Sequence, residues 1–354
     1  YGILETAVAQ GELMGAGIQV ARGGISLPPK CFGRRELKEG GAPVDSDTIF
    51  LVASITKPIV AAAVMKLVQQ GKLSLEDRVV YLIPEFGKKG KEEVRIRHLL
   101  THTSGLPDML PDNMELRARK APLSEFIERI YEVDLLFEPG TQISYQSCGT
   151  AMVGEIVERL EGVPLRDFLK TTFFDPIELE DTSLGVQEDR RDRVSDVKLP
   201  GGDFEYGGQD SDWNWNSEYW HSLGAPWGGM FTTTMELTEL LQVFLYGGKW
   251  GENRLLGPAT VAAMTSDQTS LMPDISEPDK LAQCWGLGWQ LRSRSLYGDL
   301  TSASTFGHGG ATGTVAWVDP VSQVSCVLFS NDPTGARKFR PRVSNAVAGS
   351  VLLM

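Results

Sequence analysis

The most informative segment of this sequence is IFLVASITKPIVAAAVMKLV, residues 49–68. It begins with a short apolar run, and from residue 59 onward its apolar residues recur with the spacing of a helix face. Pro58 falls in the first turn of that helix, where its missing N–H removes no hydrogen bond. The pattern predicts a helix over residues 55–68 with Ser54 at its start.

Ser54 and Lys57 form a Ser-x-x-Lys motif at this helix start. Residues three apart share a helix face, so we expect the Lys57 amine beside the Ser54 hydroxyl. The helix N-terminus directs unpaired N–H groups toward the serine, where an oxyanion would form. A partly buried lysine with a lowered pKa can supply the base that a serine nucleophile needs. We interpret a second match, Ser195 to Lys198, as a chance occurrence in a polar loop.

The composition indicates a folded protein with a sizeable core. Of 354 residues, 42% are hydrophobic and 23% are charged, which excludes disordered, collagen-like and coiled-coil classes. The net charge of −12 argues against a nucleic-acid partner. No apolar run reaches the roughly 18 residues that cross a bilayer, so we expect no membrane span.

The beginning of the sequence leaves the compartment open. It lacks the basic and apolar regions of a signal peptide, and it also lacks an initiator Met. A cytoplasmic location follows if the N-terminus is complete, and a periplasmic or secreted one if a signal peptide was removed. The sequence does not indicate the oligomeric state.

The common cofactor and metal motifs are absent from the sequence. His98 and His102 have the spacing of a zinc pair, but Leu99 stands where HExxH has Glu, and no carboxylate nearby offers a third ligand. The glycines of residues 15–20 lack the third position of a dinucleotide fingerprint, and Trp250 breaks a possible P-loop. No serine lies in G-x-S-x-G. We expect no metal and no cofactor, and we interpret the four cysteines as buried or free thiols: Cys31, Cys148, Cys284 and Cys326.

The two chain ends resemble sheet-forming sequence, whereas the middle favours helices. Strands are predicted at residues 14–21, 286–291, 314–318 and 324–329, with flanking helices at 3–13 and 342–354. Further helices are predicted at 123–131, 150–160, 165–171 and 235–245. We therefore predict an α/β domain from residues 1–70 and 256–354, with a mainly helical insertion over 71–255.

Two later motifs complete a pattern with Ser54-x-x-Lys57. Tyr145-Gln-Ser147 lies in a loop before a predicted helix, and His308-Gly-Gly-Ala311 lies between two predicted strands. In this order the motifs resemble those of the serine β-lactamase and penicillin-binding protein superfamily. The sequence is most similar to the branch with class C β-lactamases, DD-peptidases, D-aminopeptidases and family VIII carboxylesterases. Similar phrases at residues 99–106, 228–233, 285–289 and 306–310 extend the resemblance over about residues 15–350.

The resemblance implies a β-lactamase/transpeptidase-like α+β fold, in which N- and C-terminal helices flank an antiparallel sheet and the active site lies between sheet and insertion. It implies that Ser54 is the acylated nucleophile, Lys57 its proton partner and Tyr145 the general base and acid. The backbone N–H groups of Ser54 and Ala311 would form the oxyanion hole. The residues implied for substrate binding are Ser147, His308, Gly309 and Gly310.

Two departures from the family pattern bear on the substrate. Ser147 replaces the Asn of Tyr-x-Asn, which argues against efficient β-lactam turnover. His308 replaces the Lys of Lys-Thr-Gly, so a positive charge facing a substrate carboxylate would depend on pH. We therefore expect turnover of carboxylate-bearing substrates to fall as pH rises through the His308 pKa. A Trp-rich loop either rims an apolar acyl pocket or packs for stability alone: Trp213, Trp215, Trp220 and Trp227.

The function that best fits these features is a serine hydrolase acting through an acyl-enzyme on Ser54. We predict a carboxylesterase of small esters with weak β-lactamase activity. One alternative is a peptidase specific for D-amino acids, such as a DD-peptidase or D-aminopeptidase. A second is a non-catalytic binding protein of the same fold. The expected partners are small esters, amides or β-lactams.

Overall fold

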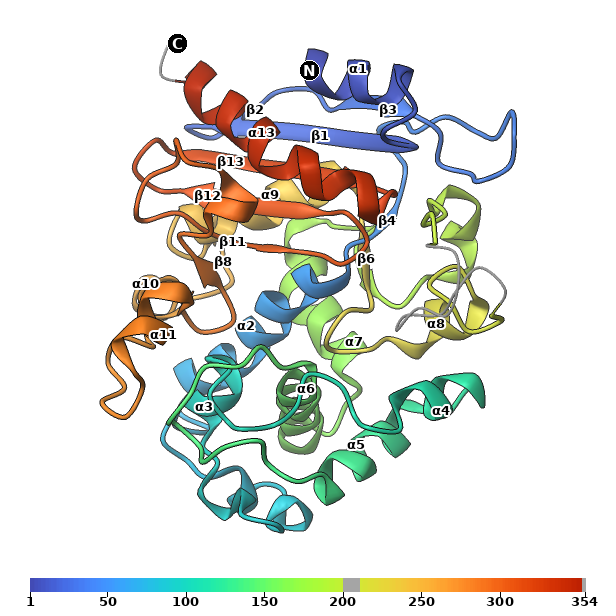
Figure 1. Cartoon of the computed structure of the whole chain (residues 1–354). Coiled ribbons are helices and arrows are strands. Elements are labelled where there is room, and N and C mark those ends of the chain that lie inside the picture. The colour runs from blue at the N-terminus through green and yellow to red at the C-terminus, as the bar shows by residue number, and fades with distance from the viewer. Residues whose placement is uncertain (200–210, 352–354) are drawn as a thin grey trace.

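A computed structural model describes residues 1–199 and 211–351 (Figure 1). Eight strands form its main sheet: β1 (Gly15–Arg22), β2 (Ile25–Ser26), β3 (Lys30–Gly33), β9 (Cys284–Trp285), β10 (Gln290–Leu291), β11 (Phe306–Gly309), β12 (Val315–Asp319) and β13 (Val324–Ser330). Their order is β2-β1-β13-β12-β11-β10-β9, with β3 also paired to β1, and every pairing is antiparallel. The first long strand thus pairs with the last, and the predicted antiparallel α+β fold is confirmed.

Helices surround this sheet and fill the lower half of the molecule in Figure 1. They are α1 (Gly2–Ala9), α2 (Thr56–Gln69), α3 (Ile96–Leu100), α4 (Asn113–Ala118), α5 (Leu123–Glu132), α6 (Ser147–Glu161), α7 (Leu165–Leu169), α8 (Glu218–Leu223), α9 (Thr234–Leu245), α10 (Pro258–Thr265), α11 (Glu277–Ala282), α12 (Arg294–Tyr297) and α13 (Pro333–Val351). Two small sheets contain β4 (Phe50–Leu51), β5 (Ser183–Leu184), β6 (Met230–Thr232), β7 (Lys249–Trp250) and β8 (Asn253–Arg254). None of the helices in the described residues is long and apolar enough to span a bilayer.

Both faces of the sheet are covered, which explains why β13 is buried along its whole length. Cys326 and Leu328 pack on one face with residues of α1 and α13. Val327 and Phe329 point to the other face, where α9 lies. This alternation is the period of two that a strand imposes on its side chains.

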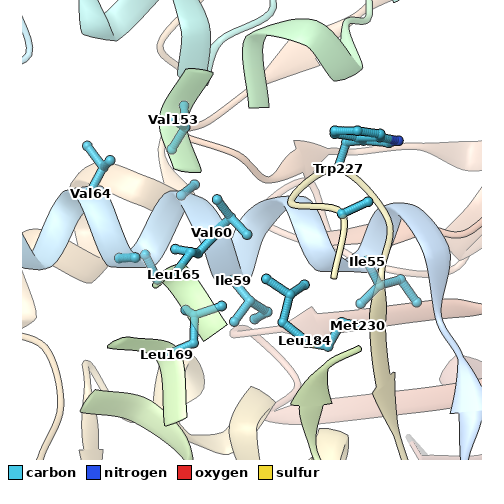
Figure 2. Packing of buried hydrophobic residues seen from close by; sticks show 14 of the residues in the cluster. Ile55, Ile59, Val60, Val64, Val153, Leu165, Leu169, Leu184, Trp227 and Met230 are labelled. Atoms are coloured by element: carbon cyan, nitrogen blue, oxygen red, sulfur yellow. The ribbon is translucent and has the colours of Figure 1, made fainter. Parts of the chain in front are cut away.

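Helix α2 runs between the sheet and the helices α3 to α7, which are called the helical half below. It is buried on nearly all sides. Figure 2 shows Ile59 and Val60 of this helix among side chains from other elements, including Val153, Leu165 and Met230. The apolar stripe predicted from the sequence is therefore part of a core helix that packs all round. This packing holds the N-terminal end of α2, which begins two residues after Ser54.

Several predicted elements differ from the structure. The first helix ends at Ala9 rather than at residue 13, and α6 begins at Ser147 rather than at residue 150. The strand expected at residues 286–291 is a hairpin of β9 and β10 around a turn in which the Gly286 N–H donates to the Trp289 carbonyl at 2.9 Å. The last helix begins at Pro333 rather than at residue 342, because Asp332 caps its first turn by accepting the Gly335 N–H at 3.1 Å. The charged run 337–342 and Pro341 hid this earlier start from the sequence pattern.

The position of α9 bears on the predicted division of the chain. Although α9 lies within residues 71–255, it packs against β1, β12 and β13 and belongs with the sheet. The largest buried cluster also spans sheet and helical half, since it contains Phe329 of β13 and Phe126 of α5. A boundary at residue 255 therefore stays a prediction, and the two parts share one core.

Candidate active site

Ser54 lies in a short 3₁₀ turn, Ala53–Ile55, between β4 and α2. The Val52 N–H donates to the Met230 carbonyl at 3.0 Å, and the Thr56 hydroxyl donates to the Ala53 carbonyl at 2.6 Å. Ala53 has φ +46°, a left-handed conformation that costs an alanine roughly 1–2 kcal/mol. The strained turn is therefore held by β6 on one side and by α2 on the other, which fixes the direction of the Ser54 side chain.

Lys57 lies beside Ser54, as the helical spacing predicts. Its Nζ donates to Ser54 Oγ at 3.1 Å and to the Trp227 carbonyl at 2.8 Å. The side chain is only 2% exposed, and burial lowers the pKa of Lys57 to about 7, while the carboxylate of Asp108 acts in the opposite direction. Near neutral pH a substantial fraction of this amine is therefore uncharged and able to accept a proton.

Tyr145 reaches the same point from the loop before α6. Lys57 Nζ lies 4.7 Å from the centre of its ring. Around Tyr145 lie His102, Trp285 and His308, with ring centroids 4.8, 5.9 and 5.9 Å from its own. The three sequence motifs thus converge from distant parts of the chain. His102 and Trp285 lie within the family-like stretches 99–106 and 285–289 of the sequence, but no role in the site was predicted for either residue.

The structure corrects the expected charge of His308. The side chain is 3% exposed, and its Nδ1 is 2.7 Å from the Gly309 carbonyl, to which it donates. Burial first, and then the nearby charges of Lys57 and Arg340, lower the pKa of His308 to about 3. His308 is therefore neutral at physiological pH, and it presents no pH-dependent positive charge to a substrate carboxylate.

Hydrogen bonds join the turn after β11 to the segment that leads into Ser54. The Thr312 hydroxyl donates to the Leu51 carbonyl at 2.6 Å, and the Thr314 hydroxyl donates to the Val52 carbonyl at 3.1 Å. Gly310 approaches so closely that a Cβ there would lie 2.2 Å from the Val52 oxygen. Only glycine permits this contact, which keeps the His-Gly-Gly-Ala segment against the nucleophile.

Ala311, at the end of that segment, lines a small cavity of about 40 Å³ together with Ser54, Lys57 and Tyr145. Ala311 and Tyr145 also line a pocket of about 470 Å³, large enough for a small organic substrate. The walls of this larger pocket include Trp215, Trp285, Leu296, His308, Arg337 and Arg340.

The Trp-rich stretch predicted as a loop contains helix α8, which carries Trp220, and it contributes to the site. Trp215, Trp220 and Trp227 line the small cavity, and Trp215 also lines the larger pocket. Trp213 is buried but lines neither. The loop therefore packs around the nucleophile. Residues 201–210, which belong to the same Gly- and Asp-rich stretch, lie outside the described residues.

Asp108 is a site residue that was not predicted from the sequence. The N–H and the hydroxyl of Ser147 donate to Asp108 Oδ1 at 2.8 and 2.6 Å, so the carboxylate caps the first residue of α6. Asp108 also lines the small cavity with Lys57. Its only signal in the sequence is its place two residues after the phrase at 99–106.

The structure also places two other sequence motifs, the histidine pair and the second Ser-x-x-Lys. His98 lies in α3, whereas His102 follows the end of that helix with φ +60°, and the described residues contain no group of three or more possible metal ligands. In the second Ser-x-x-Lys, Lys198 Nζ donates to Asp332 at 2.8 Å and the Ser195 hydroxyl donates to the Arg35 carbonyl at 3.2 Å. Neither residue of this pair lines the cavities at Ser54.

Comparison with known proteins agrees with this geometry. The Beta-lactamase family model matches residues 2–348. The chain belongs to the β-lactamase family. This family member is a serine hydrolase of the β-lactamase and penicillin-binding protein superfamily.

Individual relatives of this β-lactamase family protein differ in their named activities. A Salmonella agona protein named "Putative D-alanyl-D-alanine carboxypeptidase" is 28% identical over 81% of this chain and 70% of its own. A penicillin-binding protein homologue from Caulobacter crescentus is 24% identical, with TM-score 0.78 over 97% of this chain and 95% of that chain. A family VIII carboxylesterase is 22% identical, with TM-score 0.77 over 95% and 94% of the two chains. The two structures share the fold with this protein.

Proposed function

We propose that this protein is a carboxylesterase of small esters that works through a covalent acyl-enzyme on Ser54. The observation that carries the proposal is the Lys57 amine, 3.1 Å from Ser54 Oγ in a buried site that lowers the Lys57 pKa to about 7. A neutral amine at this distance can activate the serine hydroxyl.

The proposed reaction has two steps, each through a tetrahedral oxyanion. Ser54 Oγ bonds to the ester carbonyl carbon as its proton passes to the neutral Lys57 amine, which then passes a proton on to Tyr145 as Tyr145 gives up its own. Tyr145 delivers a proton to the alcohol oxygen as the C–O bond breaks. The backbone N–H groups of Ser54 and Ala311 stabilise the oxyanion. Water then attacks the acyl-enzyme, which releases the acid and restores the Ser54 hydroxyl.

The surroundings of Ser147 favour an ester over a β-lactam. The Ser147 hydroxyl is engaged by Asp108, and the neighbouring Gln146 amide is engaged by the His98 carbonyl at 3.1 Å and by Ser104. Neither side chain offers the amide that the family's Tyr-x-Asn presents. The apolar walls of the larger pocket, from Trp215, Trp285 and Leu296, suit the alkyl or aryl group of an ester.

A D-amino-acid peptidase is the second candidate, because one observation favours it. Arg337 and Arg340 line the larger pocket beside His308, and guanidinium groups suit the terminal carboxylate of a peptide. The Salmonella relative is named for such an activity. Since His308 is neutral, these arginines are the cationic groups among the lining residues of that pocket that could meet a carboxylate.

Initial rates with p-nitrophenyl butyrate test the proposal in wild type, Ser54→Ala and Lys57→Ala. We expect turnover by wild type and background rates for both variants. Ser195→Ala is the matched control, because it removes the serine of the other Ser-x-x-Lys and should keep the wild-type rate. Ester hydrolysis at wild-type rates by Ser54→Ala would show that Ser54 is not the nucleophile.

Parallel assays separate the alternatives. A peptide ending in D-Ala-D-Ala and the β-lactam nitrocefin are supplied under the same conditions. Faster turnover of the peptide than of the ester would replace the esterase by the peptidase. A protein that hydrolyses none of these and is not labelled by a fluorophosphonate would be a binding protein.

A further inference from the structure

Arg340 contacts the peptide group that carries one of the proposed oxyanion-hole donors. It lies on α13, and its Nη2 donates to the Gly310 carbonyl. That carbonyl and the Ala311 N–H belong to one peptide group. Because a trans peptide is planar, its C=O and N–H point in opposite directions. A cation held at the Gly310 oxygen therefore fixes the direction of the Ala311 N–H on the other side.

We propose that Arg340 is a positioning residue of the oxyanion hole, which orients and polarises the Gly310–Ala311 peptide so that the Ala311 N–H becomes a stronger donor to the oxyanion. This inference rests on the proposed function, in which Ala311 supplies that donor. The physical basis is cooperativity, since a hydrogen bond accepted by an amide carbonyl strengthens the N–H of the same amide.

Contacts on the other side of the segment support this role. The Gly310 N–H donates to the Thr314 carbonyl at 2.7 Å, and a Cβ on Gly310 would lie 2.1 Å from Thr314 Oγ1. Thr314 in turn donates to the Val52 carbonyl at 3.1 Å. These contacts set the backbone before the Gly310–Ala311 peptide. The Gly310 carbonyl accepts the Gly313 N–H at 3.2 Å within the turn, and Arg340 adds a charged side-chain donor to the same oxygen.

The charge of Arg340 persists under assay conditions. Burial, and secondarily the charge of Arg337, lower the pKa of Arg340 to about 10. The guanidinium therefore remains protonated at neutral pH, and it sits close enough to the site to lower the pKa of His308 as well.

The test compares Arg340→Met, Arg340→Lys and a matched control, Lys338→Met. Lys338 lies on the same helix but faces solvent, where its Nζ pairs with Glu12 at 2.7 Å. The substrate is p-nitrophenyl butyrate, which has no carboxylate, so loss of substrate-carboxylate binding cannot explain an effect. Rates are expressed per active site, counted by fluorophosphonate labelling of Ser54.

We expect Arg340→Met to lower kcat roughly tenfold to hundredfold with KM within about twofold, because it weakens one oxyanion donor without removing it. The inhibition constant of a boronic acid, which forms a tetrahedral adduct on the serine, should rise by the same factor. Arg340→Lys should recover most of the rate, and Lys338→Met should match wild type. If Arg340→Met does not fold, Arg340→Gln replaces it, with a smaller loss of the same kind.

Several outcomes would overturn the inference. One is a wild-type kcat per labelled site in Arg340→Met, even if its melting temperature falls, because that shows a structural role. Another is unchanged boronic acid affinity, or an Arg340→Lys variant as slow as Arg340→Met. Failure of the proposed function looks different, since wild type itself would then resist labelling and hydrolyse no ester.

Discussion

The surroundings of Lys57 shift the pKa of its amine in two opposite directions. Burial favours its neutral form, and the carboxylate of Asp108 favours its charged form. With the pKa of Lys57 lowered to about 7, the amine is neutral above pH 7 and protonated below it. Activity that depends on a neutral Lys57 should therefore increase with pH.

We predict that kcat/KM for p-nitrophenyl butyrate rises about tenfold per pH unit below pH 7 and levels off above it. Asp108→Asn removes a negative charge that favours protonated Lys57, so the rise should move to lower pH by roughly one unit. Asp112→Asn is the control, because Asp112 is partly exposed and pairs with Arg129 at 3.3 Å. A flat wild-type profile, or a shift to higher pH in Asp108→Asn, would contradict this account.

His308 provides a second prediction from protonation. Because the pKa of His308 lies near 3, its charge does not change between pH 5.5 and 8. The ratio of kcat/KM for a carboxylate-bearing ester to that for a neutral ester should therefore depend on pH in the same way in wild type and in His308→Gln. If this ratio changes with pH in wild type but not in His308→Gln, then His308 carries a charge in this pH range.

At the scale of elements, the proposed reaction requires the contact between the β11–β12 turn and the strand before Ser54. Gly310 is the point of closest approach, and an added Cβ would meet Val52 O at 2.2 Å. Backbone atoms cannot move aside without displacing β4 or the turn. Separation of these two elements would move Ala311 away from Ser54.

We therefore expect Gly310→Ala to fold but to lose kcat/KM by roughly a hundredfold or more, the loss typical of a missing oxyanion donor. Gly349→Ala is the matched control, since a Cβ at this helical glycine makes only an ordinary 3.5 Å contact with Leu300. That control should keep full activity and gain up to about 1 kcal/mol in stability. Circular dichroism and ester kinetics on both variants test this, and a fully active Gly310→Ala would show that the turn is not essential.

At the scale of the whole molecule, sheet and helices are joined by one core. Phe329 on the sheet and Phe126 and Leu169 in the helical half belong to the same buried cluster. Helix α2 lies between the two parts, and the site forms at its N-terminus. Neither part can bury its apolar surface without the other.

This shared core predicts cooperative unfolding. In urea, tryptophan fluorescence and far-ultraviolet circular dichroism should report one transition with the same midpoint. A fragment of residues 71–255 expressed alone should remain largely unfolded, because it lacks the sheet residues of the core. Two separated transitions, or a folded fragment, would show that the insertion is an independent domain.

The sequence by itself predicted the features that depend on local geometry. The Ser54–Lys57 adjacency follows from helical spacing, and the central strands and long helices follow from periods of two and 3.6. The order of the three motifs indicated the family. Residue patterns failed where local signals were mixed, as in the charged, proline-containing start of α13 and the glycine turn between β9 and β10.

Only the tertiary structure decided the chemistry at each group. The neutral His308, the lowered Lys57 pKa, the carboxylate of Asp108 at Ser147 and the contact of Arg340 with Gly310 each require segments that lie far apart in the chain. A pKa depends on burial and on neighbouring charges, and an oxyanion hole depends on the direction of particular N–H groups. Both depend on how the chain packs. Residue type and spacing could therefore predict which residues take part, but not their charge states or contacts.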